Sequence, residues 1–114
     1  MAILGFHFSG VYKDKLYSGK KKATIIEGQY SFEIGSSVCV YLSDKPNLFD
    51  DTLERRIGKA TIQFFRVCKA GELTDEEAQN CVYESKKKIM EDLVKWYKAT
   101  EETKVTYVKF RLEL

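Results

Sequence analysis

Ile57-Gly-Lys-Ala-Thr-Ile-Gln-Phe-Phe-Arg-Val-Cys-Lys69 is the stretch of sequence that decides the fold. Apolar and polar residues alternate in it, as in a β-strand with one buried face. The apolar positions change parity midway, from the even-numbered residues between 60 and 64 to Phe65 and Val67. Because an unbroken strand keeps its alternation, the change predicts a β-bulge or a strand that bends around a barrel.

Strands and helices are expected on both sides of this stretch. Strands are expected at 3–8, 23–26, 37–42 and 105–114, and helices at 11–18, from 74 onward and at 85–98. Thr74 and Glu77 form a capping-box pattern, and Gly19 follows the first helix where a left-handed residue is common. A polar loop is expected at 43–56. The order β-α-β-β-β-α-α-β favours an α+β fold, a small bent mixed-sheet β-barrel with flanking helices.

Length, charge and cysteine usage narrow the function classes. The 114 residues fit a single domain, 1–114. A net charge of +2 excludes a histone-like polycation, so binding to a polyanion requires a local cluster of charge. Cys39, Cys68 and Cys81 are widely spaced, and with one histidine they predict buried thiols and no metal or cofactor. Without a signal peptide or an apolar run of membrane length, a cytoplasmic protein with no membrane contact is expected.

A lysine-rich segment is the strongest local signal for binding. Five lysines and a single acid lie between Lys13 and Lys22, and Lys20 to Lys22 are consecutive. Adjacent ammonium groups repel one another, so an anionic partner such as phosphate would relieve the repulsion. A solvated lysine turn is the alternative interpretation. Tyr12 and Tyr17 flank the segment and are candidates for stacking on bases.

Sequence motifs along almost the whole chain point to one family. They are Phe8, Tyr12 and Leu16–Ile25, followed by Ile34–Gly35, Gly58–Ile62, Leu73–Ala78 and Tyr107–Phe110. Together these motifs resemble the ASCH domains of the PUA-like superfamily. The resemblance implies a β-barrel with flanking helices and a cleft beside the Gly-x-Lys loop, suited to RNA or to a nucleotide.

The resemblance and the lysine run together lead to the main hypothesis. We expect an RNA- or nucleotide-binding ASCH domain whose partner is RNA, a nucleoside or a nucleotide. The residues expected in its lysine-lined cleft at 19–24 are Tyr17, Gly19, Lys20, Lys21, Lys22 and Thr24. The sequence leaves the oligomeric state open.

An enzyme is the alternative. One bacterial branch of the family hydrolyses N4-acetylcytidine with a lysine, a threonine and a glutamate, and Lys21 and Thr24 match the first two. This chain has Cys81 at the glutamate position and Ile26 where the family pattern has an arginine. Lys21 and Thr24 can meet only if residues 19–22 form a turn and the strand begins after it. The two departures favour binding over hydrolysis, and a protein-interaction module is a third interpretation.

Several other side chains have both a structural and a functional interpretation. Cys81 is expected to be a core thiol rather than a nucleophile, and His7 a structural histidine. Trp96 and Tyr97 are expected to pack in the core rather than to stack on bases. The acids at 50, 51 and 54 are expected to be solvated or paired with Arg55 and Arg56 rather than to bind a cation, and Glu77 or Glu84 is a possible replacement carboxylate.

Overall fold

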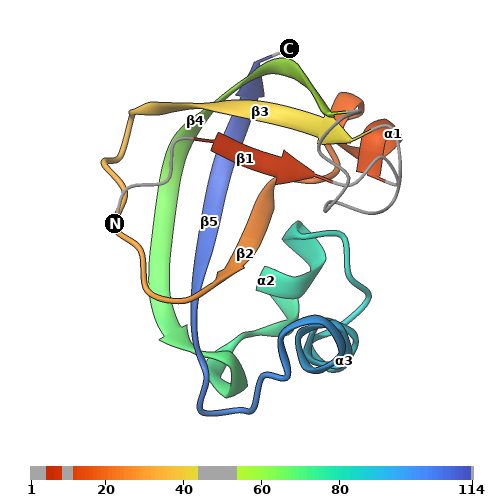
Figure 1. Ribbon diagram of the computed structural model, residues 1–114, viewed down its shortest axis with the longest axis vertical. Helices are drawn as coiled ribbons and strands as arrows, with labels where there is room; N and C mark the ends of the chain where they lie inside the picture. Colours follow the sequence, from red (N-terminus) through yellow and green to blue (C-terminus); the bar gives the residue numbers. More distant parts are fainter. Residues whose placement is uncertain (1–4, 9–11, 44–53, 114) are drawn as a thin grey trace.

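One curved mixed sheet organises the molecule (Figure 1). The computed structural model describes residues 5–8, 12–43 and 54–113, and within them five strands pair in the order β1-β3-β4-β5-β2. Their bounds are β1 Gly5–Phe8, β2 Ala23–Glu27, β3 Ser37–Ser43, β4 Glu54–Lys69 and β5 Lys104–Glu113. β1 runs parallel to β3, and the other pairs are antiparallel. The sheet is a half-barrel with β1 and β2 as its edges, which confirms the predicted α+β architecture.

The predicted bulge lies in β4. The pairing of β4 with β5 shifts register between Ile62 and Phe64, so Gln63 is the extra residue. Ile62 is buried in the curve of the sheet, and Phe65 packs against the same cluster. Phe64 points outward and is 46% exposed, so the parity changes one residue earlier than the sequence pattern suggested. A bulge re-aims the side chains that follow it, and here it brings Phe64 to the surface.

The helices cover one end of the sheet and flank the other. Their bounds are α1 Lys13–Tyr17, the 3₁₀ turn η3 Ala70–Glu72, α2 Asp75–Asn80 and α3 Lys86–Tyr97. In Figure 1, α2 and α3 lie below β2, while α1 lies near the ends of β1 and β3. The predicted capping box is confirmed, because Thr74 Oγ1 accepts from the Glu77 amide at 3.1 Å and Glu77 Oε1 accepts from the Thr74 amide at 2.9 Å.

Strand β5 is buried on both faces over its first half. Val108 and Phe110 face the inside of the curve with the aromatic cluster of β1. Val105 and Tyr107 face the opposite way and pack against the apolar side chains of α2 and α3. Farther along this outer face the side chains are less covered, and Arg111 is exposed. The candidate functional site lies at this open end of the outer face.

Some expectations about the elements need correction. Strand β3 extends to Ser43 and strand β4 begins at Glu54, so both ends of the predicted loop 43–56 are strand residues, and residues 44–53 lie outside the described residues. Tyr97 is 51% exposed and does not pack in the core with Leu93. Cys39 is only partly buried, whereas Cys68 and Cys81 are buried as predicted. The predicted start of the first helix and the acids at 50 and 51 lie outside the described residues.

Candidate functional site

The segment between α1 and β2 is a tight turn. Helix α1 has five residues, too short to be stable alone, and it is held by Leu16, whose side chain is 1% exposed. The Gly19 amide donates to the Leu16 carbonyl at 3.2 Å, and Gly19 has a φ of +78°. This left-handed conformation favours glycine, as the sequence predicted. Strand β2 starts at Ala23, so residues 19–22 form the turn that the hypothesis requires.

Hydrogen bonds fix the backbone of Lys21 and Lys22 at the end of the turn. The Lys21 amide donates to the Lys15 carbonyl at 3.0 Å, which ties the turn to α1. The Lys22 amide donates to the Asn80 carbonyl at 2.9 Å, and the Lys22 carbonyl accepts from the Phe110 amide at 2.9 Å. Consequently, the end of α2 and strand β5 both position this turn.

Lys21 is buried, with only 5% of its surface exposed. Its ammonium donates to the Cys81 carbonyl at 3.2 Å and lies 4.6 Å from the ring centre of Tyr12 and 5.3 Å from that of Phe8. Burial lowers the pKa of Lys21 from 10.5 to about 8, with a smaller contribution from Lys15 and an opposing one from Cys81. The aromatic faces attract the cation but replace little of its lost hydration. We call the surroundings of the Lys21 ammonium, formed by Phe8, Tyr12 and the Cys81 carbonyl, the Lys21 pocket.

A chain of hydroxyl groups supports one wall of the Lys21 pocket. Tyr83 Oη donates to Asp92 Oδ2 of α3 at 2.7 Å. Burial raises the pKa of Tyr83, and its hydrogen bonds with Tyr12 and Asp92 raise it further. Tyr83 therefore stays a neutral phenol that links the Tyr12 ring to α3.

A groove of about 440 Å³ lies along the outside of the turn, and we call it the basic groove. It is lined by Leu16, Tyr17, Ser18, Gly19, Lys21 and Lys22 of the α1–β2 segment and by Gln63, Lys109, Phe110, Arg111 and Leu112 of the sheet. None of these lining residues is acidic. The Lys22 and Arg111 side chains are exposed and Lys109 is partly exposed, so three cations converge on one hollow.

The structure brings together only part of the predicted site. Tyr17, Gly19, Lys21 and Lys22 line the basic groove, while Lys20 and Thr24 do not. Thr24 pairs with Val108 in the strand register, and the Lys21 ammonium bonds to Cys81 rather than to Thr24.

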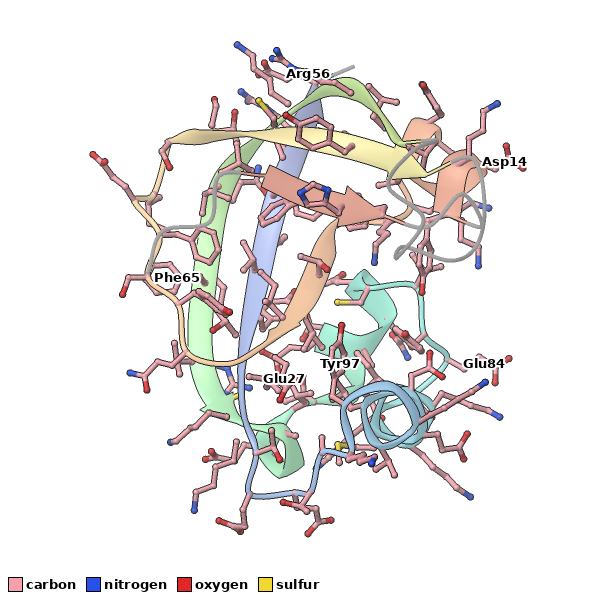
Figure 2. All side chains as sticks on the ribbon, in the orientation of Figure 1. Asp14, Glu27, Arg56, Phe65, Glu84 and Tyr97 are labelled. Atoms are coloured by element: carbon pink, nitrogen blue, oxygen red, sulfur yellow. The ribbon has the colours of Figure 1, made fainter. Side chains whose placement is uncertain are left out.

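Cys81 occupies the position of the glutamate in the amidohydrolases that the sequence resembles, and Glu77 and Glu84 are the predicted replacement carboxylates. Each of the three is either buried, engaged in other hydrogen bonds or directed away from the sheet (Figure 2). Burial raises the pKa of the Cys81 thiol to about 11, so it is a core thiol and a poor nucleophile. Burial acts to raise the pKa of Glu77, but hydrogen bonds from Arg66 and Thr74 lower it overall. Arg66 holds both carboxylate oxygens of Glu77, at 2.6 and 3.1 Å. Glu84 is exposed and points away from the sheet (Figure 2).

A second groove of about 540 Å³ adjoins the first, and we call it the Phe64 groove. It is lined by Phe64, Arg66, Glu72, Thr74, Glu76, Glu77, Asn80, Tyr107 and Lys109. Lys109 lines both grooves. The Asn80 side-chain amide donates to Tyr107 Oη at 3.0 Å, so a polar network connects the floor of this groove to the end of α2.

Sequence reasoning missed the contribution of the sheet to the site. Lys109 and Arg111 alternate with Phe110 on the closing strand, a pattern that places both on the face opposite the core. That signal was available, but nothing in the sequence showed that β5 lies beside the lysine turn. Gln63, the extra residue of the bulge, also lines the groove.

Two general features of the described residues bear on function. They contain no group of three or more histidine, cysteine or acidic side chains placed to hold a metal ion. None of the helices in the described ranges is long and apolar enough to cross a membrane.

Comparisons with known proteins support the architecture. No protein-family model matches the sequence, and no curated protein matches it either. The structure is similar to the crystal structure of an ASCH domain from Lactobacillus crispatus, with a TM-score of 0.64, 12% identity, and coverage of 94% of this chain and 79% of that one. It is also similar to an Enterococcus faecalis protein of the DUF984 family, with a TM-score of 0.62, 10% identity, and coverage of 98% and 82%. The chain therefore has the ASCH fold that its motifs predicted.

Proposed function

We propose that this ASCH-fold chain binds RNA or a nucleotide through the basic groove. The observation that carries the proposal is the convergence of Lys22, Lys109 and Arg111 on one hollow whose lining contains no acid. Such a site attracts phosphate, because each neutralised phosphate releases condensed counterions from the nucleic acid. Arg111 also pairs with Glu113 at 3.1 Å, but both side chains are largely exposed, so a phosphate can compete for the guanidinium.

Tyr17 extends the groove with an aromatic surface. Its side chain is 51% exposed at the end of α1, next to the turn. A base can stack on an exposed ring at this position while its phosphate lies among the cations. The groove thus offers the two kinds of contact by which proteins bind single-stranded nucleic acid without reading a fixed sequence.

A salt titration tests the proposal. Binding of a short fluorescent single-stranded RNA should be measurable at low salt and weaken steadily as salt increases. Combining Lys22→Ala, Lys109→Ala and Arg111→Ala removes three cations. Since each phosphate contact on a single strand contributes about 0.7 to the logarithmic salt slope, the slope should fall by about 2.

A charge-matched variant separates the groove from net charge. Lys87→Ala, Lys88→Ala and Lys95→Ala also remove three exposed cations, all on α3 and away from the groove lining. This variant should bind nearly as well as the unmodified protein. Undetectable binding at low salt, or equal losses in the two triple variants, would exclude the basic groove as the RNA site.

The Lys21 pocket supports a second candidate, an amidohydrolase for N4-acylated cytidine nucleosides. A lysine with a pKa of about 8 has a substantial neutral fraction near physiological pH and can act as a general base. In the reaction, water cleaves the amide bond to give cytidine and a carboxylic acid. Thr24 would be the second participant, although the Lys21 ammonium is hydrogen-bonded to Cys81.

Incubation with N4-acetylcytidine tests this candidate. Chromatography should show cytidine and acetate formed in equal amounts, and both Lys21→Met and Thr24→Ala should abolish the reaction. If product formation does not exceed that of the Thr24→Ala protein, the chain is not this enzyme.

A further inference from the structure

The bulge in β4 places the two grooves side by side. Gln63, the extra residue, lines the basic groove, and Phe64, the next residue, lines the other. Phe64 is the direct cross-strand partner of Lys109, which lines both. Side chains of directly opposed residues on one face of a sheet lie within contact distance of each other. One cation and one exposed ring therefore stand together at the junction.

The Phe64 ring is a supported platform. It lies edge-on to the Tyr107 ring, with ring centres 6.2 Å apart and an angle of 60° between the planes. Tyr107 is itself buried and hydrogen-bonded to Asn80. Phe64 nevertheless keeps 46% of its surface exposed. A large apolar ring held in place and left open to solvent is suited to stacking with a planar ligand.

Charge distinguishes the two grooves. The basic groove is free of acids among its lining residues, whereas Glu72, Glu76 and Glu77 line the Phe64 groove. Arg66 neutralises Glu77, but Glu76 stays exposed. Carboxylates repel phosphate and accept hydrogen bonds from the exocyclic amino group of cytosine. The Phe64 groove is thus suited to a base, and the basic groove to phosphate.

From this arrangement we propose that the ligand is a single-stranded RNA rather than a single nucleotide. Its backbone lies in the basic groove, the chain passes Lys109, and a neighbouring base stacks on Phe64. This inference rests on the proposed RNA-binding function and adds the polymeric nature of the ligand and a base subsite at Phe64.

A comparison of two ligand lengths tests the inference. Affinities are measured for cytidine monophosphate and for a tetracytidylate at the same salt concentration. The Phe64→Leu variant keeps an apolar side chain against Tyr107 but lacks an aromatic face. It should weaken tetracytidylate binding by about fivefold to one hundredfold, the range of one lost base–aromatic stack, and leave the monophosphate unaffected. Tyr97→Leu is the matched control, because Tyr97 is 51% exposed on α3 and lines neither groove.

The outcomes separate this inference from the proposed function. If the monophosphate and the tetracytidylate bind equally well, the ligand is a single nucleotide, and the inference fails while the proposed function stands. If Phe64→Leu and Tyr97→Leu have the same effect on the tetracytidylate, Phe64 is no subsite and the inference fails as well. If neither ligand binds, both proposals fail together. Thermal melting of each variant shows whether it is folded.

Discussion

Lys21 and Lys22 are adjacent in the sequence but occupy opposite environments. Lys21 is 5% exposed, and its ammonium lies among two aromatic rings and one carbonyl. Lys22 is exposed and lines the basic groove with two cations of β5. The backbone explains the difference, since α1, α2 and β5 each hold one hydrogen-bonding group of the turn. A run of like charges is thus divided between a pocket and a surface.

The two lysines contribute differently to stability and to binding. Burial of an ammonium costs free energy of folding, and groups with a strongly shifted pKa are concentrated at functional sites. An exposed lysine costs little and contributes through the long-range field. We therefore expect substitutions in the Lys21 pocket to change stability and its pH dependence, and substitutions in the basic groove to change affinity and its salt dependence.

The largest expected effect is on the pH dependence of stability. Lys21 has a pKa of about 8 in the folded protein and 10.5 when unfolded. Between these values the unfolded state binds more protons, so the free energy of unfolding rises with pH. The rise amounts to about 2–3 kcal/mol between pH 7 and pH 10, and Lys21→Met removes it. Chemical denaturation at several pH values measures it as the difference between the two proteins.

The pH dependence of Lys21→Met must be subtracted from that of the unmodified protein, because other buried groups lower the free energy of unfolding as pH rises. Burial raises the pKa of Cys68 and Cys81, so these thiols lower stability as pH rises above the unfolded thiol pKa. They are present in both proteins and largely cancel. Lys20→Met is the control, because Lys20 is exposed, and it should retain the profile of the unmodified protein. Parallel profiles for Lys21→Met and the unmodified protein would show that the Lys21 pocket does not perturb the amine.

A smaller effect on stability is expected from Tyr83, which supports one wall of the Lys21 pocket. Tyr83→Phe removes the hydroxyl that donates to Asp92 and that is hydrogen-bonded to Tyr12. A partly buried carboxylate that loses its donor costs about 1–2 kcal/mol of stability. RNA affinity should stay within twofold, because Tyr83 does not line the basic groove. Denaturant titration of Tyr83→Phe beside Tyr97→Phe checks this, and equal stabilities would contradict it.

The sequence predicted the fold well because its signals were local. The parity change in 57–69, the capping box at Thr74 and the glycine after α1 each reflect neighbouring residues, and each is confirmed. The exposure of Tyr97 was predicted wrongly because periodicity alone does not show where a packed helix face ends.

The candidate site was harder to predict because it is assembled from distant segments. Its turn was recognisable, but Lys109 and Arg111 come from a strand some 90 residues away in sequence, and only the pairing of β2 with β5 brings them there. The burial of Lys21 was also invisible, since it depends on Tyr12, Phe8 and the end of α2. Burial is the main cause of the lowered Lys21 pKa, and Lys15 is the lysine that contributes to it.

The smallest expected effect is on the salt dependence of RNA binding, and it is the most selective test of the basic groove. Lys20→Ala and Lys22→Ala each remove one exposed cation from the same turn, so both lower the net charge equally. Only Lys22 lines the basic groove, and its backbone hydrogen bonds survive the substitution. Lys22→Ala should therefore reduce the salt slope of RNA binding by about 0.7, while Lys20→Ala leaves it unchanged.

Affinities at four or more salt concentrations resolve this difference. Equal reductions in the two variants would mean that RNA responds to the charge of the whole lysine run, as the sequence alone suggested, and that the groove has no special role. A reduction confined to Lys20→Ala would move the binding surface away from β5, because Lys20 lines neither groove. A reduction confined to Lys22→Ala would place phosphate beside Lys109 and Arg111, since these are the cations of the sheet that share the groove with Lys22.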